Sequence, residues 1–402
     1  MIKILMGGSP CTHWSCAKTK DRETTASGLG WELFKNYLYA KERFNPDFFL
    51  YENNKSAAQA IKDQISDELG VELMYINSAL VSAQNRQRFY AFNWHVQQPI
   101  DRGIFLRDIL EGNGTRLPQF GMDGKARTVT AGYSKQGTAP AQIQNNAFSD
   151  NPSKQQYDYI AEPLNTTADG KAYTIKAQYA KNSVKNFLSA DHFPQTGVAI
   201  PINTTADGKA QCLRATCYKD GMRNMICNNV DRRTCVAIPS EYAENLPIYE
   251  VKGGFIFIKD KPYPIELEDG FYAIRKLTVT ECARLQTMPD DYCKAVSKSQ
   301  AYKGLGNGWT AEVIIHILSG VLANVDRNEK IVVLSMYDGI GTGRYCLDKM
   351  GFKNVEYYAF EIDEYAMKVA NDNYPDIMQY GDAFQIRDNA FNINSLLSEV
   401  II

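Results

Sequence analysis

With 402 residues, the chain is long enough for two domains, and its composition is that of an ordinary globular protein rather than a disordered or fibrous one. Its net charge of −2 provides no overall basic field for nucleic acid, although residues 120–235 hold 14 Lys and Arg against nine Asp and Glu. Nine scattered cysteines without a Cys-x-x-Cys pair predict reduced thiols and no metal site. The lack of a signal-peptide pattern or a long apolar run predicts a cytoplasmic protein.

Residues 2–6 form an apolar run that two glycines end, which predicts a buried strand and a tight turn. Cys11, in a Gly-Gly-Ser-Pro-Cys segment, therefore follows the carboxyl end of a strand, where open α/β sheets bind ligands. A thiolate at such a place can serve as a nucleophile. Taken alone, a Pro-Cys pair also fits a small residue packed behind a turn.

The next segment, residues 12–30, is polar and predicts a loop that closes over a substrate. The spacing of apolar residues predicts a helix at 31–43, and the apolar residues 48–51 predict a second buried strand. Glu52 ends that strand, so its carboxyl group could keep a raised pKa and share a proton. The alternative role for Glu52 is to stabilise a helix N-terminus.

Residues 57–69 predict a helix, residues 71–81 a strand, and residues 89–94 an aromatic strand. Arg86 and Arg88 come directly before the aromatic strand. Guanidinium groups beside a strand suit an anionic or carbonyl partner. They equally suit a surface cluster of ion pairs.

The region from about 100 to 272 is richer in Gly, Asn, Thr and Gln and contains a repeat. The eight letters NTTADGKA occur at 165–172 and again at 203–210, and a weaker copy begins at Asp123. Each copy has an Asp-Gly turn before an alternating segment, which predicts hairpins. Basic residues among Thr and Tyr can contact phosphates and base edges, although the repeats could also be purely architectural.

Regular structure returns after residue 273. Residues 278–286 predict a capped helix, with Thr278 or Thr280 as the cap. Residues 304–309 predict a turn, because three of the six are glycine. Residues 310–322 predict a largely apolar helix.

The last segment has the pattern of a nucleotide-binding unit. A buried strand at 331–337 leads through a glycine-rich turn at 338–343 into an amphipathic helix. The next two strands end at Glu361, where an acidic residue can hold a ribose, and at Asp382, which can accept from an adenine amine. Five reactive residues therefore follow apolar strands and are expected at one edge of a parallel sheet: Cys11, Glu52, Asp338, Glu361 and Asp382.

Together these motifs resemble those of the DNA (cytosine-5) methyltransferase family, over most of the chain outside residues 100–272. The resemblance rests on GGSPC at 7–11, ENN at 52–54, QNRQR at 84–88, RKLTVTECARLQTMPDDY at 275–292, GLGNGW at 304–309, YDGIGTG at 337–343, Glu361 and Asp382. It implies an α/β fold with a Rossmann-like S-adenosylmethionine-dependent methyltransferase domain, in which helices cover both faces of a mostly parallel sheet. A smaller, irregular, β-rich target-recognition domain would accompany it.

The order of the segments differs from the usual family order, in which the cofactor segment precedes the Pro-Cys segment. Here residues 331–402 come last, so the resemblance implies a circularly permuted chain. It also implies three parts. Residues 1–99 and 273–402 would form the catalytic domain, and residues 100–272 the target-recognition domain.

The resemblance implies that Cys11 adds to C6 of a cytosine flipped out of double-stranded DNA. Glu52 would hydrogen-bond or protonate N3, while Arg88, with Arg86, would steady the base and the Cys11 loop. The methyl group would come from S-adenosyl-L-methionine, leaving S-adenosyl-L-homocysteine, without a metal. The implied cofactor-binding residues are Tyr337, Asp338, Gly339, Gly341, Glu361, Ile362, Asp382, Pro10, Asn307 and Trp309.

The implied protein is a DNA (cytosine-5-)-methyltransferase in the cytoplasm of a bacterium, encoded by the bacterium or by a phage. The sequence leaves open a restriction endonuclease partner, the oligomeric state and the DNA target, and it implies no membrane partner. One departure from the family is Asn54, where an apolar Val is usual. Two alternatives remain: the same chemistry on RNA such as transfer RNA, and a non-catalytic methyltransferase fold that binds DNA.

Overall fold

The computed structural model describes residues 1–15, 21–111, 115–116, 126, 128–131, 133, 136, 142–144, 148, 159–163, 203–204, 210–211, 248–258, 261–267 and 269–388. Contacts within the chain define two compact units. Unit 1 comprises Met1–Ile109, Gly124–Lys135 and Thr278–Ile402, and unit 2 comprises Leu110–Asp123 and Gln136–Leu277. The functional division into residues 1–99, 100–272 and 273–402 stays a prediction.

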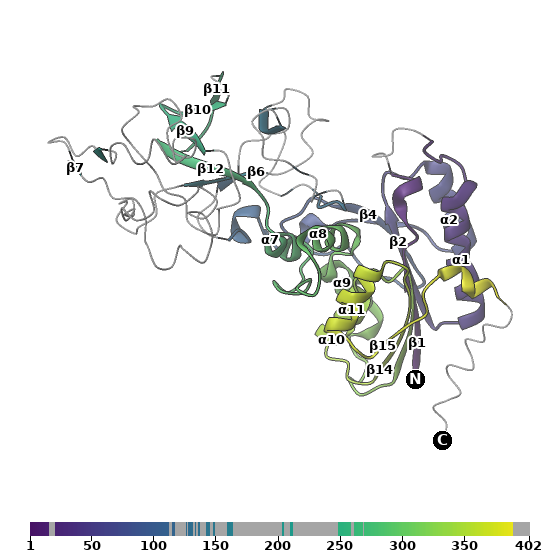
Figure 1. Ribbon diagram of the computed structural model, residues 1–402. Helices are drawn as coiled ribbons and strands as arrows, with labels where there is room; N and C mark the ends of the chain where they lie inside the picture. Colours follow the sequence, from purple (N-terminus) through teal and green to yellow (C-terminus); the bar gives the residue numbers. More distant parts are fainter. Residues whose placement is uncertain are drawn as a thin grey trace. The chain divides into compact units, whose positions relative to one another are not determined.

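Within the described residues, unit 1 is built on a seven-stranded sheet in the order β15-β14-β13-β1-β2-β4-β3 (Figure 1). Its strands are β1 (Ile2–Gly7), β2 (Phe48–Asn54), β3 (Met74–Asn77), β4 (Gln87–Phe92), β13 (Ile331–Met336), β14 (Val355–Phe360) and β15 (Ile377–Gln379). In this sheet, β4 runs antiparallel to both of its neighbours and the remaining strands run in one direction. The predicted mostly parallel, Rossmann-like α/β sheet is confirmed.

The strand β1 lies in the middle of this sheet and pairs in parallel with β13 on one side and β2 on the other. β13 is buried along its whole length, which explains its almost uninterrupted apolar sequence. Since β1, β2, β13, β14 and β15 are parallel, their carboxyl ends meet at one edge. β2 runs on to Asn54, so Glu52 lies within the end of the strand rather than after it.

Helices cover both faces of the sheet, with α1 (Gly28–Phe44) and α2 (Gln59–Leu69) on one face (Figure 1). The other face carries α9 (Ala311–Leu322), α10 (Thr342–Lys349) and α11 (Glu364–Asn373). α7 (Val279–Leu285) and α8 (Lys298–Asn307) precede α9 in the chain. At the start of α7, the Thr278 hydroxyl accepts from the Glu281 N–H and the Glu281 carboxylate accepts from the Thr278 N–H, so Thr278 is the cap.

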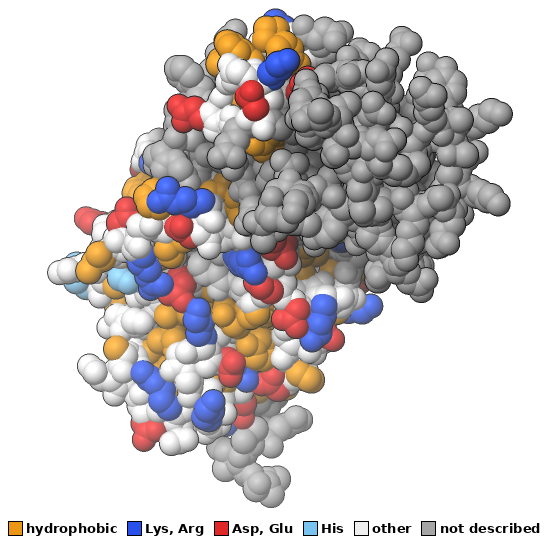
Figure 2. Space-filling model, turned by 90° about the vertical axis from the view of Figure 1, so that its left-hand side faces the viewer, with side chains coloured by type: hydrophobic (Ala, Val, Ile, Leu, Met, Phe, Trp, Pro, Cys, Tyr) orange, Lys and Arg blue, Asp and Glu red, His pale blue; other side chains and the backbone are white. Residues whose placement is uncertain are grey.

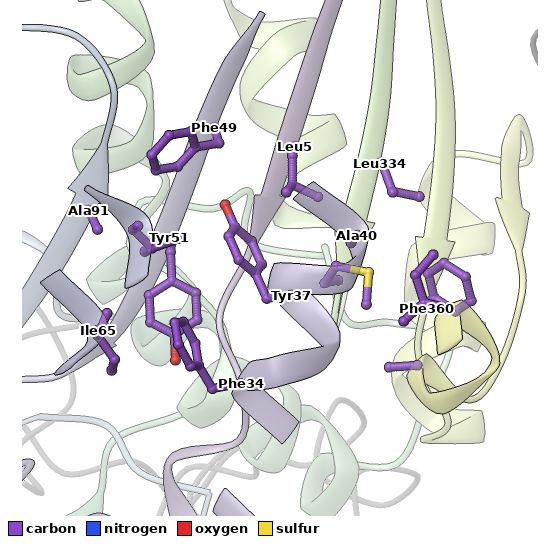
Figure 3. Close-up of a cluster of buried hydrophobic side chains, with 14 of the residues drawn as sticks. Leu5, Phe34, Tyr37, Ala40, Phe49, Tyr51, Ile65, Ala91, Leu334 and Phe360 are labelled. Atoms are coloured by element: carbon purple, nitrogen blue, oxygen red, sulfur yellow. The ribbon is translucent and has the colours of Figure 1, made fainter. Parts of the chain in front are cut away.

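A cluster of buried side chains holds α1 and α2 against the sheet (Figure 3). Phe34, Tyr37 and Ala40 recur at a spacing of three residues, so they share one face of α1. They pack against strand residues that include Leu5 and Tyr51. The rings of Tyr37 and Tyr51 meet edge to face, with centroids 5.0 Å apart. This packing fixes the positions of the strands that carry the site.

Unit 2 contains, in its described part, a six-stranded antiparallel sheet in the order β11-β10-β9-β12-β6-β5. Its strands are β5 (Thr115–Arg116), β6 (Tyr159–Pro163), β9 (Ile248–Lys252), β10 (Phe255–Ile258), β11 (Lys261–Pro264) and β12 (Gly270–Lys276). In β10, Ile256 and Ile258 are buried while Phe255 and Phe257 are exposed, as expected for a strand with one buried face. The predicted smaller, β-rich region is confirmed.

Most of the predicted repeat region lies outside the described residues, including the copy at 165–172 and the four cysteines between 212 and 235. In the second copy, β7 (Asn203–Thr204) pairs antiparallel with β8 (Ala210–Gln211). This pairing agrees with a hairpin around the Asp-Gly pair of that copy. Part of the predicted loop at 12–30, residues 16–20, also lies outside the described residues.

The prediction of a turn at 304–309 is wrong, because α8 continues to Asn307. The glycines serve packing instead. A Cβ on Gly306 would overlap the backbone of Thr130 and Ala131, so the helix can approach that segment only with glycine there. Glycine in a helix costs roughly 1 kcal/mol relative to alanine, which explains why the sequence pattern indicated a turn.

Other boundaries also differ from the prediction. The aromatic strand predicted at 89–94 is β4, which spans Gln87–Phe92, so Arg88 lies within the strand rather than before it. The predicted strand at 71–81 is shorter, because β3 ends at Asn77. There the Asn77 side chain accepts from the Ala79 N–H and starts the 3₁₀ helix η2 (Ser78–Leu80). The helix predicted at 31–43 begins at Gly28 and ends at Phe44. No helix in the described ranges is both long and apolar enough to cross a membrane.

Candidate active site

The turn after β1 is held by a small buried network of polar side chains. The hydroxyl oxygens of Ser9 and Tyr51 lie 2.7 Å apart. The Asn53 Nδ2 donates to the Ser9 carbonyl at 2.9 Å and to the Tyr51 hydroxyl at 3.0 Å. Because these groups are buried, losing one hydrogen bond would leave its partner unsatisfied. The network therefore fixes the backbone that leads into Cys11.

Cys11 begins the 3₁₀ helix η1 (Cys11–His13) and is partly exposed. Burial raises the pKa of the Cys11 thiol, the positive charges of Arg88 and Arg86 oppose that rise, and the negative charge of Glu52 adds to it. A proton on Glu52 would therefore favour the Cys11 thiolate. Among the other cysteines in the described ranges, Cys282, Cys293 and Cys346 are buried and form no disulfide bond.

The Glu52 carboxylate is 9% exposed and has a donor on each oxygen. The Arg88 Nε lies 3.0 Å from Oε1, and the Trp309 Nε1 donates to Oε2 at 3.1 Å. Gly8 allows this arrangement, because a Cβ there would lie 2.6 Å from the Glu52 carbonyl oxygen. The turn bearing Cys11 can thus lie directly against the strand bearing Glu52.

The two predicted arginines have different surroundings. Arg88 pairs with Glu52, as described above. The Arg86 guanidinium is buried and donates to the backbone carbonyls of Val129 at 3.0 Å, Gly306 at 3.2 Å and Gly308 at 2.8 Å. Arg86 therefore ties the end of α8 to residues 128–131, although it also lines the cavity described below.

Asn54, which departs from the family pattern, forms hydrogen bonds with the segments that follow η1 and β2. Its side-chain oxygen accepts from the Ser56 N–H at 3.1 Å, and its Nδ2 lies 3.5 Å from the Ser15 hydroxyl. Ser15 follows η1, so Asn54 links the end of β2 to the segment after Cys11. A valine could make neither of these hydrogen bonds.

The turn after β13 requires left-handed backbone at Tyr337, Gly339 and Gly341, whose φ angles are 61°, 63° and 78°. The conformation is unfavourable for tyrosine and needs support. The Tyr337 hydroxyl donates to the Leu33 carbonyl at 2.8 Å and accepts from the Asn36 Nδ2 at 3.0 Å. Helix α1 therefore holds the turn that faces the predicted cofactor.

Asp338 follows Tyr337 and has one satisfied and one unsatisfied oxygen. The Ser335 and Tyr357 hydroxyls donate to Oδ1 at 2.6 and 2.7 Å. Its Oδ2 is buried and has no hydrogen-bond partner within the described structure. Burial raises the pKa of Asp338 to about 6, although the two hydroxyl donors oppose the rise. The unsatisfied oxygen suits a ligand that brings a donor or a positive charge.

The other two acidic residues occupy the ends of the neighbouring strands. The Glu361 Oε2 accepts from the Gly339 N–H at 2.8 Å, and its Oε1 accepts from the N–H groups of Ile362 and Asp363 at 2.8 and 2.9 Å. The Asp382 Oδ1 accepts from the Phe384 N–H at the start of the 3₁₀ helix η8 (Ala383–Arg387). A carboxylate oxygen has two lone pairs, so both groups keep acceptor capacity for ribose hydroxyls or an amine.

One cavity of about 410 Å³ joins these two groups of residues. It is lined by thirteen of the fourteen predicted site residues, namely Pro10, Cys11, Glu52, Arg86, Arg88, Asn307, Trp309, Tyr337, Asp338, Gly339, Glu361, Ile362 and Asp382. Gly341 is outside the lining, and a Cβ there would lie 3.1 Å from the Ala370 Cβ. Its role in the structure is close packing of α10 against α11.

Several residues of the site were missed by sequence reasoning. These are the network of Ser9, Tyr51 and Asn53, the Asp338 partners Ser335 and Tyr357, and Phe384, which lines the cavity. A weak signal existed for Ser335, because it is a polar residue in an otherwise apolar strand. No signal existed for Tyr51 and Tyr357, which look like ordinary strand aromatics.

The surface charge gives little further indication of a partner. On the described part of the face drawn in Figure 2, Lys and Arg are interspersed with Asp and Glu. A nucleic acid would therefore be attracted to this part of the surface by individual basic side chains, because no large area of it carries positive charge alone.

The mostly parallel sheet, the glycine-rich turn after β13 and the acidic residues near successive strand ends define a Rossmann-like α/β domain. A family model described as C-5 cytosine-specific DNA methylase matches residues 1–322. The chain belongs to this family, whose members use S-adenosylmethionine to methylate cytosine in nucleic acid.

Among solved structures, the chain is similar to the crystal structure of a Spodoptera frugiperda DNMT2 mutant. The sequence identity is 14%, the match covers 80% of this chain and 79% of that chain, and the TM-score is 0.33. At this TM-score, the similarity carries no argument about the substrate. Comparison with curated proteins gives no match.

Proposed function

We propose that this protein methylates C5 of a cytosine in double-stranded DNA, with S-adenosyl-L-methionine as the methyl donor. One observation supports this proposal above all: Cys11 and Glu52 line the same cavity as Asp338, Glu361 and Asp382. The proposed nucleophile and the proposed proton donor thus line the same cavity as acidic residues suited to an adenosine-containing cofactor.

The chemistry at the base would begin with attack of the Cys11 thiolate on C6, which forms an Sγ–C6 bond and moves electrons towards C5. Glu52 would donate a proton to N3, which makes C6 more electrophilic. Arg88 would hold Glu52 in place through Oε1. After C5 is methylated, a base would take the C5 proton and the electrons of that C–H bond would re-form the C5–C6 double bond. The Sγ–C6 bond would break, Cys11 would leave as a thiolate, and the N3 proton would return to Glu52.

The residues around the glycine-rich turn fit the cofactor by one structural test. The Asp338 Oδ2 is buried without a partner, and a cationic ligand with N–H donors could satisfy it. Glu361 would hold the ribose, Ile362 and Asp382 would contact the adenine, and Tyr337, Gly339 and Gly341 would shape the turn beneath them. The remaining proposed contacts are Pro10, Asn307 and Trp309. When bound, S-adenosyl-L-methionine supplies an electrophilic methyl group and leaves as S-adenosyl-L-homocysteine.

Residues 100–272 would recognise the DNA target, since they carry the basic repeats. They also lie outside the motifs that resemble the catalytic part of the family. We further propose that the chain is circularly permuted. Two observations support this: the family match ends at residue 322, before β13, and β13 is nonetheless the parallel neighbour of β1. The cofactor segment would then occupy its usual place in the sheet while coming last in the chain.

The test is methylation of mixed-sequence plasmid DNA with S-adenosyl-L-methionine, read by base-resolution sequencing that detects 5-methylcytosine. We expect a defined methylated motif that disappears in Cys11→Ala and persists in the matched control Cys293→Ala, which changes a buried cysteine outside the cavity. Robust methylation by Cys11→Ala would contradict the covalent mechanism.

A parallel reaction with transfer RNA distinguishes the substrates. Methylation of RNA but not of DNA would replace the proposed substrate while keeping the chemistry. DNA binding without any methyl transfer, in protein that binds the cofactor, would favour the non-catalytic alternative.

A further inference from the structure

The segment that follows the Cys11 turn contains Glu23, whose carboxylate accepts hydrogen bonds from groups on two different elements. The Glu23 Oε2 accepts from the Trp14 Nε1 at 3.1 Å, and the His13 Nδ1 lies 3.3 Å from Oε1. The Gly30 N–H, in the first turn of α1, donates to both oxygens at 3.1 and 3.2 Å. One side chain therefore connects the end of η1 to the start of α1.

The backbone around Glu23 makes the same connection. The Glu23 N–H donates to the His13 carbonyl at 3.0 Å. The neighbouring Arg22 donates through Nε to the Trp14 carbonyl at 3.0 Å and through its other nitrogen to the Ser56 carbonyl beyond β2. Residues 13 and 14 are thus tied both to α1 and to the segment after the Glu52 strand.

Two glycines enclose the Glu23 carboxylate closely. A Cβ on Gly28 would lie 2.6 Å from Oε1, and a Cβ on Gly30 would lie 2.6 Å from Oε2 and 2.5 Å from the Trp14 Nε1. Trp14 itself is fully buried. A side chain at either glycine would therefore displace the Glu23 carboxylate from its present position.

We propose that Glu23 is a positioning residue that holds the Cys11 turn in the geometry needed for attack on the base; this inference rests on the proposed function. A carboxylate fits this place because the Trp14 Nε1–H and the Gly30 N–H can only donate, and Gly30 donates to both carboxylate oxygens, one of which becomes a donor group in glutamine. In Glu23→Gln, an amide NH₂ would face one of these donors, so the turn would loosen although the side chain keeps its size. Glu23 acts through the backbone from His13 back to Cys11 and does not itself touch the cavity.

The experiment measures two quantities in the full-length protein. The first is the rate at which iodoacetamide alkylates Cys11, followed by peptide mass spectrometry. The second is kcat for methyl transfer, together with the KM for S-adenosyl-L-methionine. In Glu23→Gln we expect alkylation to become at least ~5-fold faster and kcat to fall at least ~10-fold, with KM changed less than ~2-fold, since a tenfold rate loss needs only about 1.4 kcal/mol.

The matched control is Glu42→Gln, which changes an exposed carboxylate on the same helix α1 and should leave both quantities unchanged. Trp14→Phe removes the Nε1 donor while keeping an aromatic ring, and it serves as a second variant if Glu23→Gln does not fold. A folded Glu23→Gln with both rates equal to wild type would overturn the proposal. So would a lower kcat with an unchanged alkylation rate, because Glu23 would then act elsewhere.

The alkylation arm separates this inference from the proposed function. If the wild-type protein methylates neither DNA nor RNA, the proposed function fails, yet the alkylation rates of the two variants still show whether Glu23 holds the Cys11 turn.

Discussion

At the scale of single residues, Asp338 is the position where folding and binding make opposite demands. Its Oδ1 has two hydroxyl donors, but its Oδ2 is buried without a partner within the described structure. Burial raises the pKa of the group to about 6. Ionising it therefore costs the folded protein free energy near neutral pH, and a cationic ligand would recover that free energy on binding.

The raised pKa of Asp338 makes the free energy of unfolding depend on pH. Between the ordinary pKa of 3.8 and about 6, the folded protein binds more protons at Asp338 than the unfolded chain does. Its contribution to stability therefore falls as pH rises through that window. Asp338→Asn should be more stable than wild type by up to about 3 kcal/mol at pH 8, since one pKa unit corresponds to about 1.4 kcal/mol, and by nearly nothing at about pH 4.

Urea unfolding of wild type and Asp338→Asn at these two pH values checks the prediction. Titration calorimetry with S-adenosyl-L-methionine gives the companion result: wild-type affinity should increase between about pH 5 and pH 7, and the variant should bind weakly at both. A stability difference that does not change with pH would show that Asp338 ionises freely in the folded protein.

At the scale of helices and strands, α8 shows how one glycine sets the approach of two segments. Gly306 lies against the backbone of Thr130 and Ala131, and its carbonyl accepts from the buried Arg86. Gly304, in the same turn, faces only a side-chain methyl group of Ile340 at 2.7 Å. The same substitution at the two positions therefore meets backbone atoms in one case and a single methyl group of a buried side chain in the other.

We predict that Gly306→Ala lowers the free energy of unfolding by about 1–3 kcal/mol, the usual cost of overpacking. Gly304→Ala is the matched control and should lower the free energy of unfolding less, because both changes gain the same helix propensity but the new methyl group at 304 meets one methyl group of Ile340 rather than backbone. Denaturant unfolding of the two variants gives the comparison. Equal stabilities would mean that residues 130–131 yield to the added methyl group.

At the scale of the whole molecule, β1 and β13, which are more than 300 residues apart in the sequence, pair in the centre of the sheet. Residues of β1 and β13 pair in register from Ile2 with Ile331 to Gly7 with Met336. The Ile2 N–H also donates to the Lys330 carbonyl. Cys11 and the proposed cofactor residues after β13 therefore share one cavity although they are far apart in the sequence.

If the chain is circularly permuted as proposed, the same fold should form when the cofactor segment precedes the Pro-Cys segment. A chain that starts at Asn328, continues through a short Gly/Ser linker into Met1 and ends at Arg327 should fold and methylate the same motif. Its free energy of unfolding should lie within about 1–2 kcal/mol of wild type, because Asn328 is in an exposed connection. The control carries the same linker at the C-terminus without reordering. A permuted chain that fails to fold, beside a folded control, would contradict the prediction.

The sequence predicts those structural features that depend on residues close together in the chain, and it fails for features that depend on contacts between distant segments. The apolar runs of β1 and β13, the cap at Thr278 and the acidic strand ends are local patterns, and the structure bears them out. Gly306 was misread as a turn because its neighbour, Thr130, is far away in sequence. The partners of Asp338 were missed for the same reason. The catalytic and cofactor roles of the site residues stay predictions until the reactions above are run.

The central pairing of β1 with β13 has a consequence for synthesis on the ribosome. β1 ends at Gly7, but its parallel partner β13 begins only at Ile331. At about 5–20 residues per second, the ribosome therefore needs tens of seconds after it has made β1 to reach the strand that pairs with this edge. An unpaired apolar edge can pair with another chain. The sheet of unit 1 therefore stays incomplete until β13, β14 and β15 have been synthesised, and until then one edge of β1 has no strand beside it.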